Sequence, residues 1–334
     1  MIASATARPP RRLATLDLFR GLGRYGVILA LVALILFGAL RYDNFLGTFN
    51  VLSVLRYNSM FALIALGMCF VIMTGGIDLS VGSTAALGSV VAALLSPHGL
   101  IPGLLGGVAA GLLVGLVNGL VITRLRILPF IATLATMLAA SGCALLLAGN
   151  QSVSVSYETG FIELGQGDLL GFPVPAWIAL GAFLVGSLVL NFTAFGRTVL
   201  AVGGNEDATR LMGLPADRVT AAVYVASGGL AGLAGVVLAA QFGAGQPIEG
   251  VGWELFAIAA VVVGGTLLTG GVGSVGATLA GVLLLGLIFN ILNFENGLGT
   301  VSLSAYWQSV IRGAFLLLVV ALQARLVSRS EEPA

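Results

Sequence analysis

LFAIAAVVVGGTLLTGGVGSVGATLAGVLLLGLIFNILNF, residues 255–294, is a run of 40 positions without one charged side chain. A helix needs roughly 20 apolar residues to cross the hydrocarbon core of a bilayer. The run is therefore long enough for two membrane spans. Its glycine-rich turn at 269–272 marks the place where one span ends and the next begins.

The rest of the chain has the same character. Its 334 residues are 58% hydrophobic and only 9% charged, whereas soluble domains carry about 25% charged residues. Its mean hydropathy is +1.07. These values predict an all-α polytopic membrane protein embedded in a lipid bilayer.

Apolar segments recur along the whole sequence, and we count about ten transmembrane helices. They are expected at 25–40, 59–74, 81–95, 101–123, 128–148, 174–192, 220–241, 255–268, 273–292 and 306–323. The organisation expected from them is a cytoplasmic segment 1–24, one transmembrane domain 25–323 with a cytoplasmic loop 193–219, and a cytoplasmic tail 324–334. The first span lacks the short apolar core and small-residue cleavage site of a signal peptide, so we expect it to be uncleaved.

The arginines support this threading. With a cytoplasmic N-terminus, twelve of the 15 arginines fall on the cytoplasmic side, as the positive-inside rule requires. The connections expected at 149–173, 242–254 and 293–305 contain acidic residues and no arginine. The sequence therefore predicts cytoplasmic N- and C-termini and an acidic outer surface.

Composition also excludes most enzyme chemistry. The chain has no lysine and one histidine, so it cannot form a Walker A loop, a Schiff base or a His-rich zinc site. The G-x-G-x-x-G spacing at 271–276 lies inside the uncharged run rather than after a strand of a soluble domain, so we do not interpret it as a dinucleotide site. No cofactor or metal is expected, and a net charge of +1 gives no indication of nucleic-acid binding.

The segment GGIDLSVGS, residues 75–83, interrupts two apolar spans and places Asp78 at or near membrane depth. An aspartate at the centre of a span costs about 2.5–3.5 kcal/mol. Asp78 or Ser80 could cap the helix that starts at Val81. Alternatively, Asp78 could line a translocation path together with Asn118 and Asn290, the other polar candidates at membrane depth.

The long polar stretch 194–224 has a mixed charged and apolar core, residues 206–212, between a glycine pair and Gly213-Leu214-Pro215. This pattern predicts one short amphipathic helix at the cytoplasmic surface. The helix could dock a soluble partner or serve as a solvated connector.

The chain contains 48 glycines, about twice ordinary usage. Small residues four positions apart, as at Gly107 with Gly111 and Gly228 with Gly232, are typical of closely packed membrane helices. Some glycines could instead line a path or form a hinge. The stretches 71–95 and 261–285 share a glycine pair followed by Val-Gly-Ser, which suggests an internal repeat of the kind found in transporters.

Three passages resemble one known family: TGGIDLSVGS at 74–83, GGNEDATRLMGLP at 203–215, and WELFAIAAVVVGGTLLTGGVGSVGATLAGVLLLG at 253–286. The chain is similar, from about residue 50 to 323, to the permease subunits of bacterial ABC sugar importers of the ribose, arabinose, xylose and galactofuranose type. In detail it looks closest to a galactofuranose permease.

This resemblance implies a type II-like importer permease of the bacterial inner membrane. It implies a cytoplasmic ABC ATPase, a second permease, identical or homologous, and a periplasmic sugar-binding protein docked on the acidic outer loops. It also implies a coupling helix that faces the ATPase and comprises Gly203, Gly204, Asn205, Glu206, Asp207, Arg210, Leu211, Met212 and Gly213.

Two other classes of function compete with this interpretation. An ion-coupled secondary transporter usually carries acidic or histidine relays inside its spans, and here only Asp78 and Arg312 approach that description. The second class is a membrane enzyme or receptor. The expected spans contain no clustered histidines or cysteines and no paired carboxylates with which an enzyme could work. The sequence therefore favours a permease of an ATP-driven sugar importer.

Overall fold

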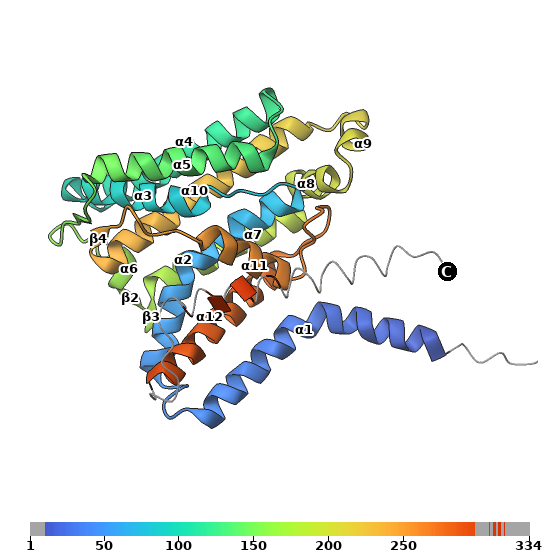
Figure 1. The fold of residues 1–334 in the computed structure, drawn as a ribbon, viewed down its shortest axis with the longest axis horizontal. Helices are drawn as coiled ribbons and strands as arrows, with labels where there is room; N and C mark the ends of the chain where they lie inside the picture. Colours follow the sequence, from blue (N-terminus) through green and yellow to red (C-terminus); the bar gives the residue numbers. More distant parts are fainter. Residues whose placement is uncertain (1–10, 298–306, 308–309, 312, 315–316, 318–334) are drawn as a thin grey trace, which may run out of the picture.

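The computed structural model describes residues 11–297 and six further positions, 307, 310, 311, 313, 314 and 317; side chains are described from residue 26 onward. The described chain is almost entirely helical (Figure 1). The helices are α1 (Arg11–Arg41), α2 (Thr48–Met73), α3 (Val81–Leu95), η1 (Ser96–His98), α4 (Leu100–Arg124), α5 (Pro129–Ala148), α6 (Glu163–Gln166), α7 (Val174–Phe192), α8 (Ala194–Gly204), α9 (Glu206–Leu211), α10 (Ala216–Phe242), α11 (Trp253–Val263) and α12 (Val275–Gly297).

Two short antiparallel strand pairs join the helices at one end. Strand β1 (Val153–Ser154) pairs with β4 (Ala244–Gly245), and β2 (Asp168–Leu169) pairs with β3 (Phe172–Pro173). These pairs lie in connections between helices. They leave the fold class all-α.

Seven helices within the described residues are long and apolar enough to cross a membrane: α2, α3 with η1, α4, α5, α7, α10 and α12. Two shorter apolar helices, Gly26–Arg41 and α11, add to them. The prediction of a helical polytopic membrane protein is confirmed. The count of ten stays a prediction, because most of the segment expected at 306–323 and the tail 324–334 lie outside the described residues.

Several predicted boundaries are correct and others are wrong. Helices α3 and α7 start and end at the predicted residues. The span expected at 255–268 is wrong, because α11 ends at Val263 and Gly265 then takes a left-handed φ of 87°. Helix α12 continues to Gly297, into what was expected to be a loop.

Helix α10 is the centre of the bundle and packs against α2, α3 and α4. The glycine spacing explains how closely it approaches α4. A Cβ added to Gly111 would lie 2.8 Å from Cα of Gly232, and a Cβ added to Gly228 would lie 2.8 Å from Cα of Gly115. The predicted small-residue faces of the two helices therefore meet, and the backbones touch because no side chain separates them.

The connection expected as an outer loop at 242–254 runs into the fold instead. Gln246 donates its backbone N–H to Ser89 Oγ at 3.0 Å, and Gly250 packs against Gly82 in the first turn of α3. The ring of Trp253 then lies 4.8 Å from that of Phe61, halfway along α2. Helix α11 thus starts deep in the bundle. Extended backbone is tolerated at such depth where protein surrounds it or where it lines a water-filled space.

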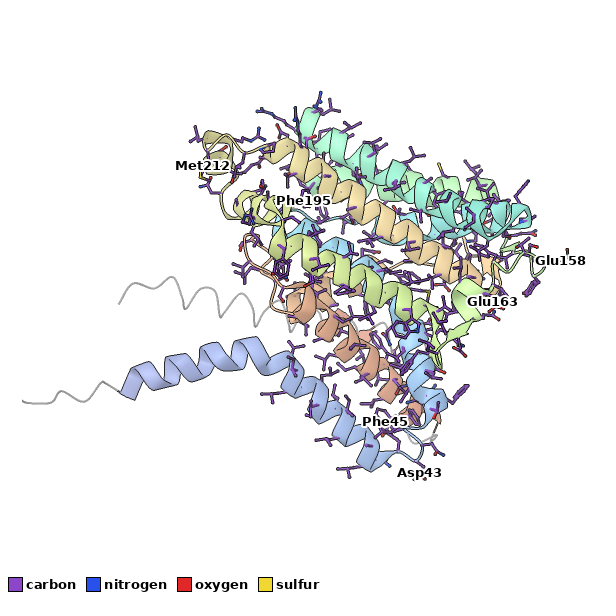
Figure 2. The ribbon with its side chains drawn as sticks, turned by 180° about the vertical axis from the view of Figure 1, so that it is seen from behind. Asp43, Phe45, Glu158, Glu163, Phe195 and Met212 are labelled. Atoms are coloured by element: carbon purple, nitrogen blue, oxygen red, sulfur yellow. The ribbon has the colours of Figure 1, made fainter. Side chains whose placement is uncertain are left out.

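The two ends of the bundle carry different surfaces. Helices α8 and α9 project at one end (Figure 1). Figure 2 shows Met212 and Phe195 at this end and Glu158, Glu163 and Asp43 at the opposite end. The distribution agrees with the predicted separation of a coupling loop from an acidic surface.

Candidate coupling surface and buried polar network

Two short helices, rather than the single one predicted, form the projecting end. Thr193 Oγ1 accepts the backbone N–H of Gly196 at 3.1 Å and so caps α8. Asn205 ends α8, and its Oδ1 accepts the N–H of Ala208 at 2.8 Å as the N-cap of α9. Gly213, with a φ of 78°, follows the last turn of α9. Each helix end therefore has the side chain or glycine that its geometry requires.

Arg210 fixes the orientation of α9. Its guanidinium donates to Glu206 Oε1 at 2.6 Å and to both oxygens of Asp217, in the first turn of α10, at 2.6 and 3.1 Å. The hydrogen bonds to Glu206 and then to Asp217 raise the pKa of Arg210 above its ordinary value. The arginine is charged at any physiological pH, so this three-residue cluster persists across that range.

The C-terminal end of α9 carries exposed apolar side chains on its outer side. Leu211 is 89% exposed and Met212 is 66% exposed, whereas Thr209 on the inner side is buried. Beside them lies a polar cavity of about 470 Å³ lined by residues that include Arg126, Asp207 and Tyr224. Leu211 and Met212, at the end of a helix too short to cross a membrane, form a candidate contact surface for another protein.

Asp78 lies in a buried network of hydrogen bonds. Its Oδ1 accepts the backbone N–H of Ser80 at 3.0 Å and the Ser80 hydroxyl at 2.6 Å, and its Oδ2 accepts the hydroxyl of Ser227 at 3.0 Å. Asn118 donates to Ser80 Oγ at 2.9 Å and accepts from Thr136 at 2.6 Å. The network joins the α2–α3 connection to α4, α5 and α10.

Both sequence candidates in this network are inaccessible in this conformation: Asp78 is 1% exposed and Asn118 is 0% exposed. The four ion pairs among the described residues do not include Asp78. Hydroxyl and N–H donors therefore take the place of a cation around this carboxylate. The backbone N–H that Asp78 accepts belongs to Ser80, which precedes α3, and the Ser80 side chain makes no capping hydrogen bond, so the geometry does not match the capping interpretation.

Asn290 lies elsewhere, towards the opposite end of the bundle. Its amide exchanges hydrogen bonds with that of Asn50 in α2, at 2.8 and 3.2 Å. The pair borders a cavity of about 530 Å³ that Tyr42 also lines. Burial of Tyr42, together with its 2.6 Å hydrogen bond to Glu295, raises the pKa of Tyr42 to about 12. The structure thus brings Asp78 and Asn118 together through Ser80 and separates both from Asn290.

Sequence analysis missed the partners that complete these contacts. Ser227 stands in a glycine-rich run of α10, and Thr136 follows one helical turn after Thr133 in α5. A single hydroxyl in an apolar helix most often bonds to its own backbone. Only the long-range packing of α4, α5 and α10 brings these hydroxyls to Asp78 and Asn118.

Comparison with known proteins identifies the family. The profile described as "Branched-chain amino acid transport system / permease component" matches residues 50–320. The chain belongs to this permease family. It is therefore a multi-pass membrane permease component, and not an enzyme.

Individual relatives match over most of their length. The chain is 41% identical over 305 residues to the ribose import permease protein RbsC of Bacillus subtilis (strain 168), covering 90% of this chain and 93% of the relative. It is 38% identical over 299 residues to the L-arabinose transport system permease protein AraH of Escherichia coli (strain K12), covering 89% of each. No solved structure was found to match the chain. These two relatives are named for pentoses, and the predicted likeness to a galactofuranose permease stays a prediction.

Proposed function

We propose that this chain is the membrane-spanning subunit of an ATP-driven importer of a monosaccharide, with a pentose such as ribose or arabinose as the first candidate. Similarity over about nine tenths of the chain to permeases named for these two sugars supports the substrate class. A chain without lysine cannot form a Walker A loop. A separate cytoplasmic ABC ATPase therefore supplies the energy.

The exposed apolar side of α9 is the observation that carries the proposed coupling. Leu211 and Met212 would enter a groove of the ATPase, while the Arg210 cluster holds α9 in place. Of the remaining predicted coupling residues, Glu206 and Asp207 lie in α9, and Gly203, Gly204, Asn205 and Gly213 flank it in the chain. In this arrangement the α9 end faces the cytoplasm, and both termini lie on the same side.

The acidic end would then face outward, towards a periplasmic binding protein that delivers the sugar. A second permease, identical or homologous, would complete the translocation path. A path role for Asp78 or Asn118 requires their network to open during the transport cycle. Asn290 borders an existing cavity and needs no such opening to meet a sugar hydroxyl.

Purification in mild detergent, followed by mass spectrometry and uptake in proteoliposomes, tests the proposed function. We expect an ATPase with a Walker A lysine and a second permease to copurify. We also expect ATP-dependent uptake of D-ribose or L-arabinose, with galactofuranose and L-leucine as the comparison solutes. Uptake that stops when the proton gradient collapses while ATP is maintained would instead establish an ion-coupled secondary transporter.

A double substitution tests the docking surface. We expect Leu211→Ser with Met212→Ser to reduce copurification of the ATPase and to lower sugar-stimulated ATP hydrolysis at least about fivefold. Leu138→Ser is the matched control, because Leu138 is 66% exposed and lies midway along α5, outside both α9 and the acidic connections. Equal hydrolysis in both variants would remove α9 from the docking surface.

A further inference from the structure

Three glycine-containing segments from distant parts of the sequence meet at the end of α8, the helix that precedes the candidate coupling helix α9. They are residues 74–76 after α2, residues 203–204 at the end of α8, and residues 269–271 between α11 and α12. Gly271 donates its backbone N–H to the carbonyl oxygen of Met73 at 3.0 Å. A Cβ added to Gly270 would lie 2.8 Å from the backbone nitrogen of Gly75 and 3.0 Å from Cα of Gly203. We call this contact the glycine junction.

Gly203 occupies the middle of the glycine junction. A Cβ at this position would overlap both the carbonyl oxygen of Met73 and the backbone nitrogen of Gly271. Its neighbour Gly204 differs, because a Cβ there would have no atom within 4 Å. Backbone therefore touches backbone at Gly203, with no flexible side chain between them that could absorb a displacement.

The junction is linked to α9 by a single residue between the helices. Asn205 follows Gly204, donates its N–H to the carbonyl of Ala201 at 3.0 Å, and caps α9 with its side chain. This arrangement holds α8 and α9 in a defined relation. Asn205 is therefore the route by which a displacement of α9 can be transmitted to Gly203.

Beyond the junction lie the two places where membrane helices are interrupted. Residues 74–80 continue into the Asp78 network, which reaches α4, α5 and α10. Residues 264–274 connect α11 to α12. Gly203 touches the backbone of Met73, the last residue of α2 before the first connection, and of Gly271 in the second connection, so both connections are packed against one residue at this level.

We propose that Gly203 is the positioning residue through which movement of α9 displaces both helix interruptions together. This inference rests on the proposed function, since it supposes that an ATPase moves α9. It adds that one backbone contact, rather than a set of side-chain contacts along α8, synchronises the two interruptions.

The test compares Gly203→Ala with Gly276→Ala in the purified complex of permease, ATPase and binding protein. Gly276 is a suitable control because it lies close to the same interruption, in the first turn of α12, and a Cβ there meets no atom within 4 Å. The probe is whichever of D-ribose and L-arabinose the wild-type complex transports. Wild-type complex without ATP-dependent uptake would refute the proposed function before any variant is compared.

We expect Gly203→Ala to lower the sugar-stimulated increment of ATP hydrolysis at least about fivefold relative to its own sugar-independent rate. Gly276→Ala should keep the stimulation of the wild type. A ratio of stimulated to basal hydrolysis that is equal in the two variants would overturn the inference.

Hydrogen exchange in the wild-type complex gives an answer even where Gly203→Ala does not assemble. We expect a non-hydrolysable ATP analogue to change the protection of residues 74–80 and of residues 264–274 at the same nucleotide concentration. A change confined to one connection, or to neither, would refute the joint displacement.

Discussion

The two helix interruptions share a sequence pattern but are held in place by different means. Both contain a Thr-Gly-Gly triplet, at 74–76 and 269–271, and both continue to Val-Gly at the start of the next helix. The first interruption has a carboxylate, Asp78, that collects three hydrogen bonds. The second has no charged residue. The glycines break the helix in both places, and the polar residues decide how the break is held.

The buried Asp78 carboxylate changes how the first interruption is held in place. A buried carboxylate is stable only with several donors, since its desolvation is costly. Ser80, directly before α3, supplies two of those donors and Ser227 in α10 supplies the third, so the carboxylate ties the interruption to α10. The polar contact beside the second interruption is weaker: in the first turn of α12, the Thr278 hydroxyl contacts the Cys69 sulfur at 3.1 Å. The second interruption relies mainly on backbone packing against the first interruption and α8.

Removing the Asp78 carboxylate should cause the largest loss of stability. Asp78→Ala leaves the N–H and hydroxyl of Ser80 and the hydroxyl of Ser227 without their acceptor, and we expect a loss of about 4 kcal/mol of stability. Thermal unfolding in detergent, followed by size-exclusion chromatography, measures the change. Asp43→Ala is the control, because Asp43 is exposed. Equal midpoints in the two variants would contradict the structural role of the network.

The second interruption should be most sensitive to steric change. Gly265 and Gly270 both have left-handed backbones, with φ of 87° each. Gly265→Ala meets no neighbour within 4 Å and should cost only the conformational term, about 1–2 kcal/mol. Gly270→Ala adds overlap with the glycine junction and should cost about 2 kcal/mol more. The same thermal assay compares them, and equal losses would show that the junction is not tightly packed.

Removal of single hydroxyls should give the smallest difference in stability loss between the two interruptions. Ser227→Ala removes a hydrogen bond to a carboxylate and should cost about 1.5 kcal/mol. Thr278→Val removes a contact with a thiol and should cost about 0.5 kcal/mol. A larger loss for Thr278→Val would reverse the assignment of the first interruption as the one held by polar contacts.

Local sequence patterns predicted much of this architecture. The uncharged runs located α3, α5 and α7 within a residue of their ends, and the glycine spacing marked the faces with which α4 and α10 pack. The amphipathic pattern located α9, and asparagine at its start and glycine after its end are sequence-visible caps. The course of residues 244–252 could not be predicted in this way. An outer loop and an extended segment beside α3 differ in long-range contacts, which leave no periodic signal.

The sequence by itself determined that the protein lies in a lipid bilayer, and it determined the apolar helices and the family. Hydrophobicity, helix length and motif order are properties of consecutive residues. Only the tertiary structure decided which polar residues meet. It placed Asp78 with Asn118 and not with Asn290, and it brought residues 75, 203 and 270 to one point. These contacts join positions up to about two hundred residues apart, and they depend on how glycine-lined helices approach one another, which is set by packing of the whole bundle.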